Sequence, residues 1–151
     1  VRTFTVSSRG NNPSPETIPA AKYSIPYIMG VALRFGAVWR EQFTEELLRD
    51  EALRAFAKSV TVEADEELDK LYDEKWPSIV EVTCKNGRIL TARRDIPKGE
   101  PEYPCSEEEL RNKFLSLASD MVSPARAEQI FQTVMRLETL SDIRELTALL
   151  S

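Results

Sequence analysis

The stretch SIVEVTCKNGRILT, residues 78–91, carries the clearest structural signal in this sequence. Its two β-rich runs are separated by Asn86 and Gly87. Asn-Gly between two such runs predicts a β-hairpin, because both residues accept the positive φ angles of a type I′ turn. An antiparallel pair of strands is therefore the centre from which the rest of the fold is predicted.

On the C-terminal side of the hairpin, a Pro- and Gly-containing loop at residues 97–104 leads into helices. Ser106 and Glu109 predict a capping box, and Ser123 before Pro124 predicts an N-cap with proline in the first helical turn. A third helix start is expected at residues 141–142. The apolar side chains that follow at helical spacing are predicted to pack in a core, not to form a cofactor-binding box: Leu110, Phe114, Leu117, Met121, Ile130, Val134, Leu137, Leu146, Leu149 and Leu150.

On the N-terminal side, residues 20–35 predict a helix that is buried on several sides. Pro26 is tolerated in a first turn, so the regular helix is expected to start near Ile25 and to stop at Gly36. Thr44 and Asp50 are predicted N-caps of two further short helices.

Two more strands are predicted away from the hairpin. Residues 1–6 alternate apolar and polar side chains, and residues 60–62 resemble the start of a strand. The acidic segment at residues 63–73 is predicted to be a solvated surface stretch. A metal role is the alternative, although the segment lacks the glycine and carbonyl pattern of calcium loops.

Together these patterns predict an α+β fold, with a mostly antiparallel sheet of about four strands packed against several helices. Residues 1–151 are expected to form a single domain. Because the chain opens inside a strand pattern, we expect it to be the C-terminal part of a longer protein, with a processed terminus as the alternative.

The composition excludes several classes of protein. The net charge is −5 with scattered basic residues, whereas nucleic-acid binding needs a basic stripe. No apolar run is long enough to cross a bilayer, so neither nucleic acid nor membrane is expected as a partner. Cys84 and Cys105 are too few for a disulfide framework, which predicts reduced thiols and a cytoplasmic location; one bridge between them is the alternative.

The chain contains no histidine. Ser-His and Cys-His nucleophile pairs are therefore impossible within it, and a structural zinc site is not expected. The single glycine of residues 8–12 does not make a phosphate loop. We predict no catalytic residue and no metal ligand within this chain.

One group of polar side chains could bind an anion. Lys22, Tyr23, Ser24 and Tyr27 gather before a predicted helix N-terminus, where free N–H groups and the helix dipole favour negative charge. The alternative is structural: Ser24 caps the helix and both tyrosines pack with exposed hydroxyls.

Four segments, in order, resemble the C-terminal domain of the MmgE/PrpD family over nearly the whole chain from Ile18. They are AAKYSIPY at residues 20–27, KNGR at residues 85–88, the run of Gly99, Pro104, Ser106, Glu109, Leu110, Lys113 and Phe114, and the ending with Leu137, Glu138, Leu149 and Leu150. Tyr23 stands where phenylalanine is usual in the family.

The resemblance implies a function. Family members include 2-methylcitrate dehydratase, cis-aconitate decarboxylase and iminodisuccinate epimerase, which abstract or replace a proton beside a carboxylate of a small polycarboxylic acid without a metal cofactor. Their catalytic histidines and lysines lie chiefly in a large helical N-terminal domain, and they are commonly homodimers. From this resemblance we expect Lys22, Ser24 and Tyr27 to be substrate-binding or domain-interface residues.

Two functions remain open. In the first, the chain supplies one wall of the cleft of a lyase or isomerase, and its partner is the helical domain. The chain is then inactive alone, because the main catalytic residues lie in that domain. In the second, it is a non-catalytic interaction or regulatory module whose apolar residues 25–33 form an exposed patch.

Overall fold

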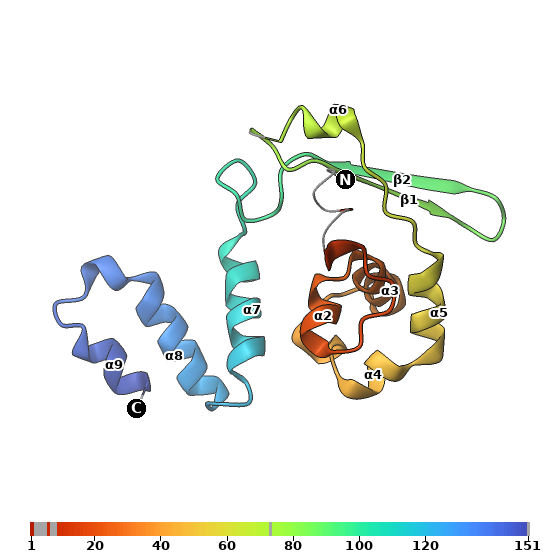
Figure 1. Ribbon diagram of the computed structural model, residues 1–151. Helices are drawn as coiled ribbons and strands as arrows, with labels where there is room; N and C mark the ends of the chain where they lie inside the picture. Colours follow the sequence, from red (N-terminus) through yellow and green to blue (C-terminus); the bar gives the residue numbers. More distant parts are fainter. Residues whose placement is uncertain (2–5, 7–8, 73, 151) are drawn as a thin grey trace. The chain divides into compact units, whose positions relative to one another are not determined.

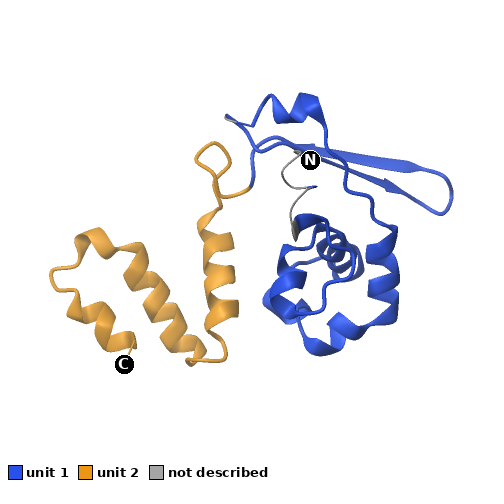
Figure 2. Ribbon diagram, in the orientation of Figure 1, with its two compact units in different colours: residues 1–97 blue, residues 98–151 orange. Residues whose placement is uncertain are grey.

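The computed structural model describes residues 1, 6, 9–72 and 74–150. The chain divides into two compact units, Val1–Pro97 and Lys98–Ser151, coloured separately in Figure 2. The predicted α+β class is confirmed. That the whole chain forms a single domain stays a prediction, and each unit is described by itself.

The first unit contains short helices and one β-hairpin (Figure 1). In chain order its elements are η1 (Arg9–Asn11), α2 (Ile18–Tyr23), α3 (Ile25–Phe35), η2 (Arg40–Gln42), α4 (Glu45–Arg49), α5 (Glu51–Ser59), α6 (Glu66–Asp69), β1 (Ser78–Thr83) and β2 (Ile89–Arg94).

Capping side chains set the helix boundaries in this unit. The predicted helix of residues 20–35 is two helices, α2 and α3, that meet at Ser24. The predicted start at Ile25 and stop at Gly36 are confirmed, the latter with a left-handed φ of 68°. Thr44 and Asp50 cap α4 and α5 as predicted, because each side chain accepts a hydrogen bond from a backbone N–H three residues on.

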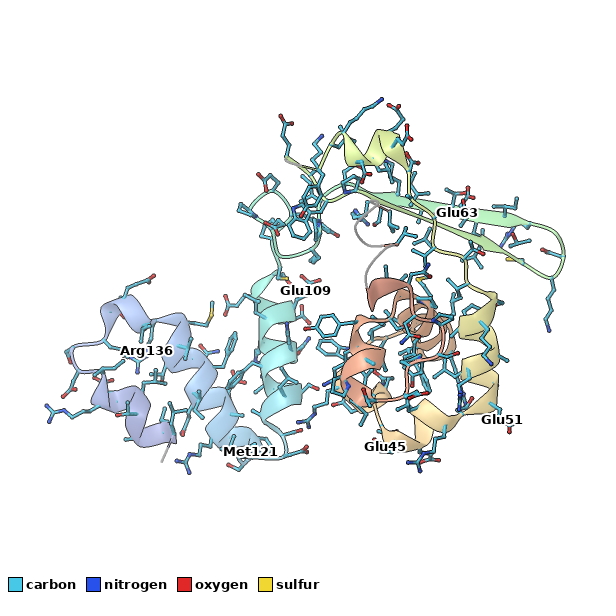
Figure 3. The ribbon with its side chains drawn as sticks, in the orientation of Figure 1. Glu45, Glu51, Glu63, Glu109, Met121 and Arg136 are labelled. Carbon is cyan, nitrogen blue, oxygen red and sulfur yellow. The ribbon has the colours of Figure 1, made fainter. Side chains whose placement is uncertain are left out.

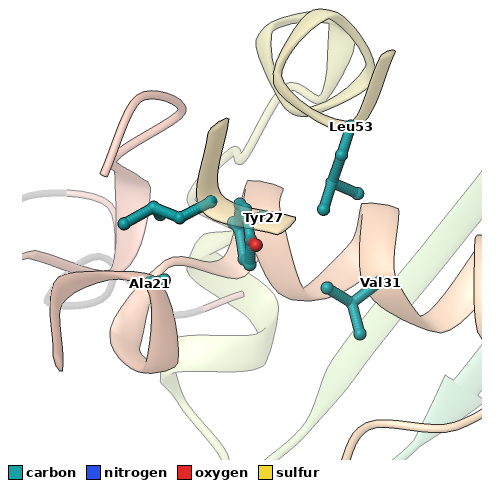
Figure 4. Close-up of a cluster of buried hydrophobic side chains, with 5 residues drawn as sticks. Ala21, Tyr27, Val31 and Leu53 are labelled. Carbon is teal, nitrogen blue, oxygen red and sulfur yellow. The ribbon is translucent and has the colours of Figure 1, made fainter. Parts of the chain in front are cut away.

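The core of the first unit is built by side chains from α2, α3, α4 and α5 (Figure 4). Gly30 lets α3 and α5 approach closely: a Cβ atom at this position would lie 2.8 Å from Cδ1 of Leu53. The buried cluster consists of Ala21, Tyr27, Val31, Leu48 and Leu53, with the half-buried Phe43 packed against it.

The hairpin of β1 and β2 is confirmed, with Ser78 paired to Arg94 and Thr83 to Ile89. The predicted type I′ turn is wrong. The N–H of Gly87 donates to the carbonyl of Cys84 at 2.9 Å, and among the described residues only glycines have positive φ, 81° at Gly87. The connection is therefore a type I turn followed by a glycine bulge, in which one glycine suffices for the left-handed position.

The prediction of about four strands is not confirmed. The segment 1–6 falls mostly outside the described residues. Residues 60–62 belong to no strand: the backbone at Val60 is extended, but no ladder forms there, and Val62 is buried as a core side chain. Just beyond, Val1 donates to the carbonyl of Glu63 at 3.2 Å and accepts from the N–H of Asp65 at 3.0 Å.

The acidic segment is also more ordered than predicted. Asp65 accepts hydrogen bonds from the N–H groups of Glu67 and Leu68 and so caps α6. Leu68 is buried while the glutamates of this helix are exposed. The segment is thus a short surface helix anchored by one apolar side chain.

The second unit is helical. Its elements are α7 (Glu107–Ala118), α8 (Pro124–Met135), η3 (Leu137–Thr139) and α9 (Arg144–Leu150). The predicted capping box of Ser106 and Glu109 and the predicted N-cap Ser123 are both confirmed. Figure 3 labels Glu109 in the first turn of α7 and Met121 beyond its end, where the methionine is 82% exposed.

Side-chain contacts between α7 and α8 hold this unit together. The Phe114 and Phe131 rings pack with centroids 6.1 Å apart, and Nη2 of Arg111 lies 2.7 Å from Oε2 of Glu128. The prediction that all the apolar side chains of these helices pack in a core is wrong for six of them, whose surfaces are more than 40% exposed: Leu110, Leu117, Met121, Val134, Leu137 and Leu150.

None of the described helices combines the length and the apolar composition that crossing a bilayer requires.

Candidate functional site

Ser24 connects α2 to α3 and is fully buried. Its hydroxyl accepts a hydrogen bond from the N–H of Tyr27 at 3.1 Å and donates to the carbonyl of Asn12. The first contact is the cap that the sequence predicts. The second ties the preceding loop to the helix junction, and no sequence pattern revealed it because the two residues are distant along the chain.

Tyr27 lies in the core, with only 1% of its surface exposed. Its ring packs on that of Phe43, with centroids 6.1 Å apart. Its hydroxyl has no hydrogen-bond partner within the described residues. The expectation of an exposed hydroxyl is therefore wrong for Tyr27, although Tyr23 is 70% exposed.

The electrostatic surroundings keep the Tyr27 phenol neutral. Burial raises its pKa, and the negative charge of Asp50 raises the pKa further. A phenol in this state can donate a hydrogen bond and cannot serve as an anionic base near neutral pH.

Lys22 lies in the last turn of α2 and is exposed. The structure thus brings Ser24 and Tyr27 into direct contact and places Lys22 on the surface. At the N-terminus of α3, the Tyr27 N–H that could have met an anion is bound by Ser24. This arrangement favours the structural alternative for Ser24. A role for all three residues at a substrate site or a domain interface stays a prediction.

An ion pair beside this cluster was missed by the sequence analysis. Nη1 of Arg34 lies 2.7 Å from Oδ2 of Asp50, joining the end of α3 to the N-cap of α5. The Arg34 guanidinium and the N–H of Leu53 lower the pKa of the Asp50 carboxyl. The only signal in the sequence was that Asp50 occupies a capping position, and this does not predict which basic residue it pairs with.

Across the described residues, no three His, Cys, Asp or Glu side chains are gathered as a metal site would need. Cys84 and Cys105 are both free thiols.

Comparison with known proteins identifies the family. The model of the MmgE/PrpD C-terminal domain matches residues 2–139. Cis-aconitate decarboxylase of Mus musculus is 31% identical over 140 residues, which cover 93% of this chain and 28% of that protein. The enzyme of the same name from Homo sapiens is 31% identical over 144 residues, covering 93% and 29%.

A fungal relative gives the same result. Cis-aconitate decarboxylase-like protein oryM of Aspergillus oryzae is 30% identical over 137 residues, covering 91% of this chain and 28% of that protein. The chain therefore spans less than a third of the length of these relatives. Because the family model and the relatives align with most of the chain, it belongs to the MmgE/PrpD family, whose C-terminal domain it matches.

Proposed function

We propose that this chain is the C-terminal domain of a lyase that acts on a small polycarboxylic acid and that the chain is inactive alone. The observation that carries the proposal is the alignment of 93% of the chain with a cis-aconitate decarboxylase. Decarboxylation of cis-aconitate is accordingly the first reaction to test. Dehydration of 2-methylcitrate and epimerisation are the other reactions of the family that we keep open.

The chemistry divides between this chain and the rest of the protein. Loss of carbon dioxide leaves a carbanion that a proton donor must protonate, whereas removal of a proton beside a carboxylate needs a general base to accept it. In both reactions, nearby cationic groups stabilise the negative charge that develops. The chain has no histidine, so any imidazole must come from elsewhere. We propose the helical N-terminal domain that the family resemblance implies as the source.

Within this chain, we assign Lys22, Ser24 and Tyr27 to the edge of the substrate site. The Tyr27 hydroxyl supports this assignment, because a buried donor without a partner within the described residues is unusual and a bound ligand would supply the missing acceptor. Lys22 is exposed and would attract a carboxylate as a point charge. Ser24 would act indirectly, by fixing the helix start that carries Tyr27.

Further properties are proposed from the resemblance to the family and from the composition of the chain. We propose a single domain over residues 1–151, a homodimer in the full-length protein, reaction without a metal cofactor and a cytoplasmic location.

A non-catalytic interaction module is the second candidate. Leu33 and Phe35, at the end of α3, are 51% and 40% exposed, which favours a contact surface there. The patch is smaller than the sequence predicted, because Pro26, Gly30 and Val31 of the same helix are buried.

The test is turnover of cis-aconitate, 2-methylcitrate and citrate, measured with this chain alone and with the protein in which it is joined to the sequence encoded before it. Turnover only by the longer protein supports the lyase proposal. Turnover by the chain alone would show that the catalytic groups lie within it. Absence of turnover from both, with the longer protein folded, would favour the interaction module.

A matched pair of variants tests the site. In the active protein, Tyr27→Phe removes the buried hydroxyl, and Tyr23→Phe removes an exposed one on the same segment. If Tyr27 binds the substrate, kcat/KM falls only in the first variant. Equal values for both variants would remove Tyr27 from the site.

A further inference from the structure

The turn between β1 and β2 holds an asparagine directly before a glycine, and both residues are exposed. The N–H of Gly87 donates to the carbonyl of Cys84 at 2.9 Å. Oδ1 of Asn86 accepts a hydrogen bond from the N–H of Arg88 at 3.1 Å. The ladder resumes at once, since the N–H of Cys84 donates to the carbonyl of Arg88 at 2.8 Å.

The backbone nitrogen of Gly87 can react with the side-chain amide of Asn86. When the Gly87 nitrogen loses its proton, it can attack Cγ of Asn86, form a five-membered succinimide and release ammonia. Water then opens the ring at either carbonyl, giving aspartate or isoaspartate at position 86. Glycine has no side chain to hinder the attacking nitrogen and the freest backbone of any residue, so it is the most favourable neighbour for this reaction.

We propose that Asn86 is a site of spontaneous deamidation and that the folded turn limits its rate. Two contacts oppose the attack. The Gly87 N–H is held by the Cys84 carbonyl, which disfavours loss of its proton, and the Asn86 amide is fixed by the Arg88 N–H. Reaction requires the turn to open, and the rate in the folded protein therefore reports the opening of the hairpin.

The two products differ in their effect on the fold. Aspartate keeps an oxygen that accepts from the Arg88 N–H, so the turn survives with one more negative charge. Isoaspartate inserts a methylene into the main chain between positions 86 and 87. That change lengthens the turn by one main-chain atom and weakens the adjacent pairing of Thr83 with Ile89.

The experiment is peptide mapping by mass spectrometry after incubation at mildly alkaline pH, with the folded protein and with the same protein in urea. Asn112, which precedes Lys113, is an internal reference with a bulky neighbour. Asn86→Gln is the control variant, since attack of the Gly87 nitrogen on the longer side chain would have to close a six-membered imide, which forms far more slowly than the five-membered succinimide. Aspartate and isoaspartate are separated by chromatography of the peptide.

In urea, we expect deamidation at Asn86 well before any at Asn112, and none at position 86 in the Gln variant. In the folded protein, the rate at Asn86 should fall at least about tenfold, each tenfold step corresponding to about 1.4 kcal/mol of opening free energy. Equal rates at Asn86 and Asn112 in urea would overturn the site. Equal rates at Asn86 in folded and unfolded protein would overturn the restraint.

Discussion

Arg34 and Asp50 form an ion pair, with Nη1 and Oδ2 2.7 Å apart, that joins the last turn of α3 to the first turn of α5. The other carboxylate oxygen of Asp50 accepts from the N–H of Leu53 at 2.7 Å. One side chain therefore caps a helix and fixes it to its neighbour. Both contacts favour the ionised carboxyl, which is why the pKa of Asp50 lies below its usual range.

The lowered pKa of Asp50 predicts an acid-dependent part of the stability. A group whose pKa is lower in the folded state stabilises the fold above its unfolded pKa of about 3.9, and this contribution is lost as the pH falls. Asp50→Asn keeps a capping oxygen and removes the titration. We expect the variant to lose less stability than the wild type between neutral pH and acid, as measured by urea unfolding. Glu109, Glu128 and Asp142 also have lowered pKa values, so some pH dependence remains. The same dependence of the free energy of unfolding on pH in both proteins would contradict the prediction.

Tyr27→Phe should not destabilise the chain alone. The hydroxyl is buried without a partner, and an unsatisfied buried donor costs about 1–3 kcal/mol. We expect a gain of up to about 1 kcal/mol in the free energy of unfolding, because part of the cost is relieved by local adjustment. Thermal unfolding of the wild type and the variant checks it. A loss of more than about 1 kcal/mol would mean that the hydroxyl has a partner, such as a buried water.

Gly30→Ala should destabilise the first unit although alanine is the better helix former. The new methyl group would lie 2.8 Å from Cδ1 of Leu53 and 3.1 Å from Cδ1 of Phe56. We expect a net loss of about 1 kcal/mol, because crowding a packed contact outweighs the gain in helix propensity of about 1 kcal/mol.

To test this explanation, Gly30→Ala is also made in the Leu53→Ala variant, which lacks the nearer of the two atoms that the new methyl group would contact. In that background Gly30→Ala should cost less than in the wild type, since the contact at 2.8 Å is gone while the propensity gain and the contact with Phe56 at 3.1 Å remain. The measurement is a double-mutant cycle by urea unfolding. An equal change in the free energy of unfolding in both backgrounds would contradict the proposed clash with Leu53.

Ser24→Ala should cost more than Ser106→Ala. Each change removes a helix N-cap, which costs about 1 kcal/mol. Ser24 also donates to the Asn12 carbonyl within the core, and loss of that contact adds about 1 kcal/mol. Chemical unfolding of the two variants gives the comparison, and equal losses would show that the contact with Asn12 contributes nothing to stability.

The features that the sequence predicted correctly are local. Ser24, Thr44 and Ser106 were identified as caps, and each cap is a hydrogen bond that spans three residues. The hairpin was also found, because Asn86 and Gly87 mark a reversal between neighbouring segments. The turn type was not, since one left-handed glycine followed by a bulge serves as well as two residues with positive φ.

The features that the sequence left undecided depend on residues far apart in the chain. Residues 60–62 have strand-forming side chains, yet a strand exists only where a neighbour completes its hydrogen bonds. The sequence offers many acidic residues as possible partners of Arg34, and Arg34 pairs with Asp50 because α3 packs on α5. The Tyr27 hydroxyl was expected at the surface and lies in the core.

For this protein, then, the sequence by itself determined the family, the class of fold and several helix caps. Each cap depends on a pattern within a few neighbouring residues, and the family on four short segments in order. Tertiary structure alone decided which predicted strand has a partner, which charge Asp50 meets and whether the Tyr27 hydroxyl reaches solvent. Burial and pairing are properties of the packed chain, and no short segment contains them.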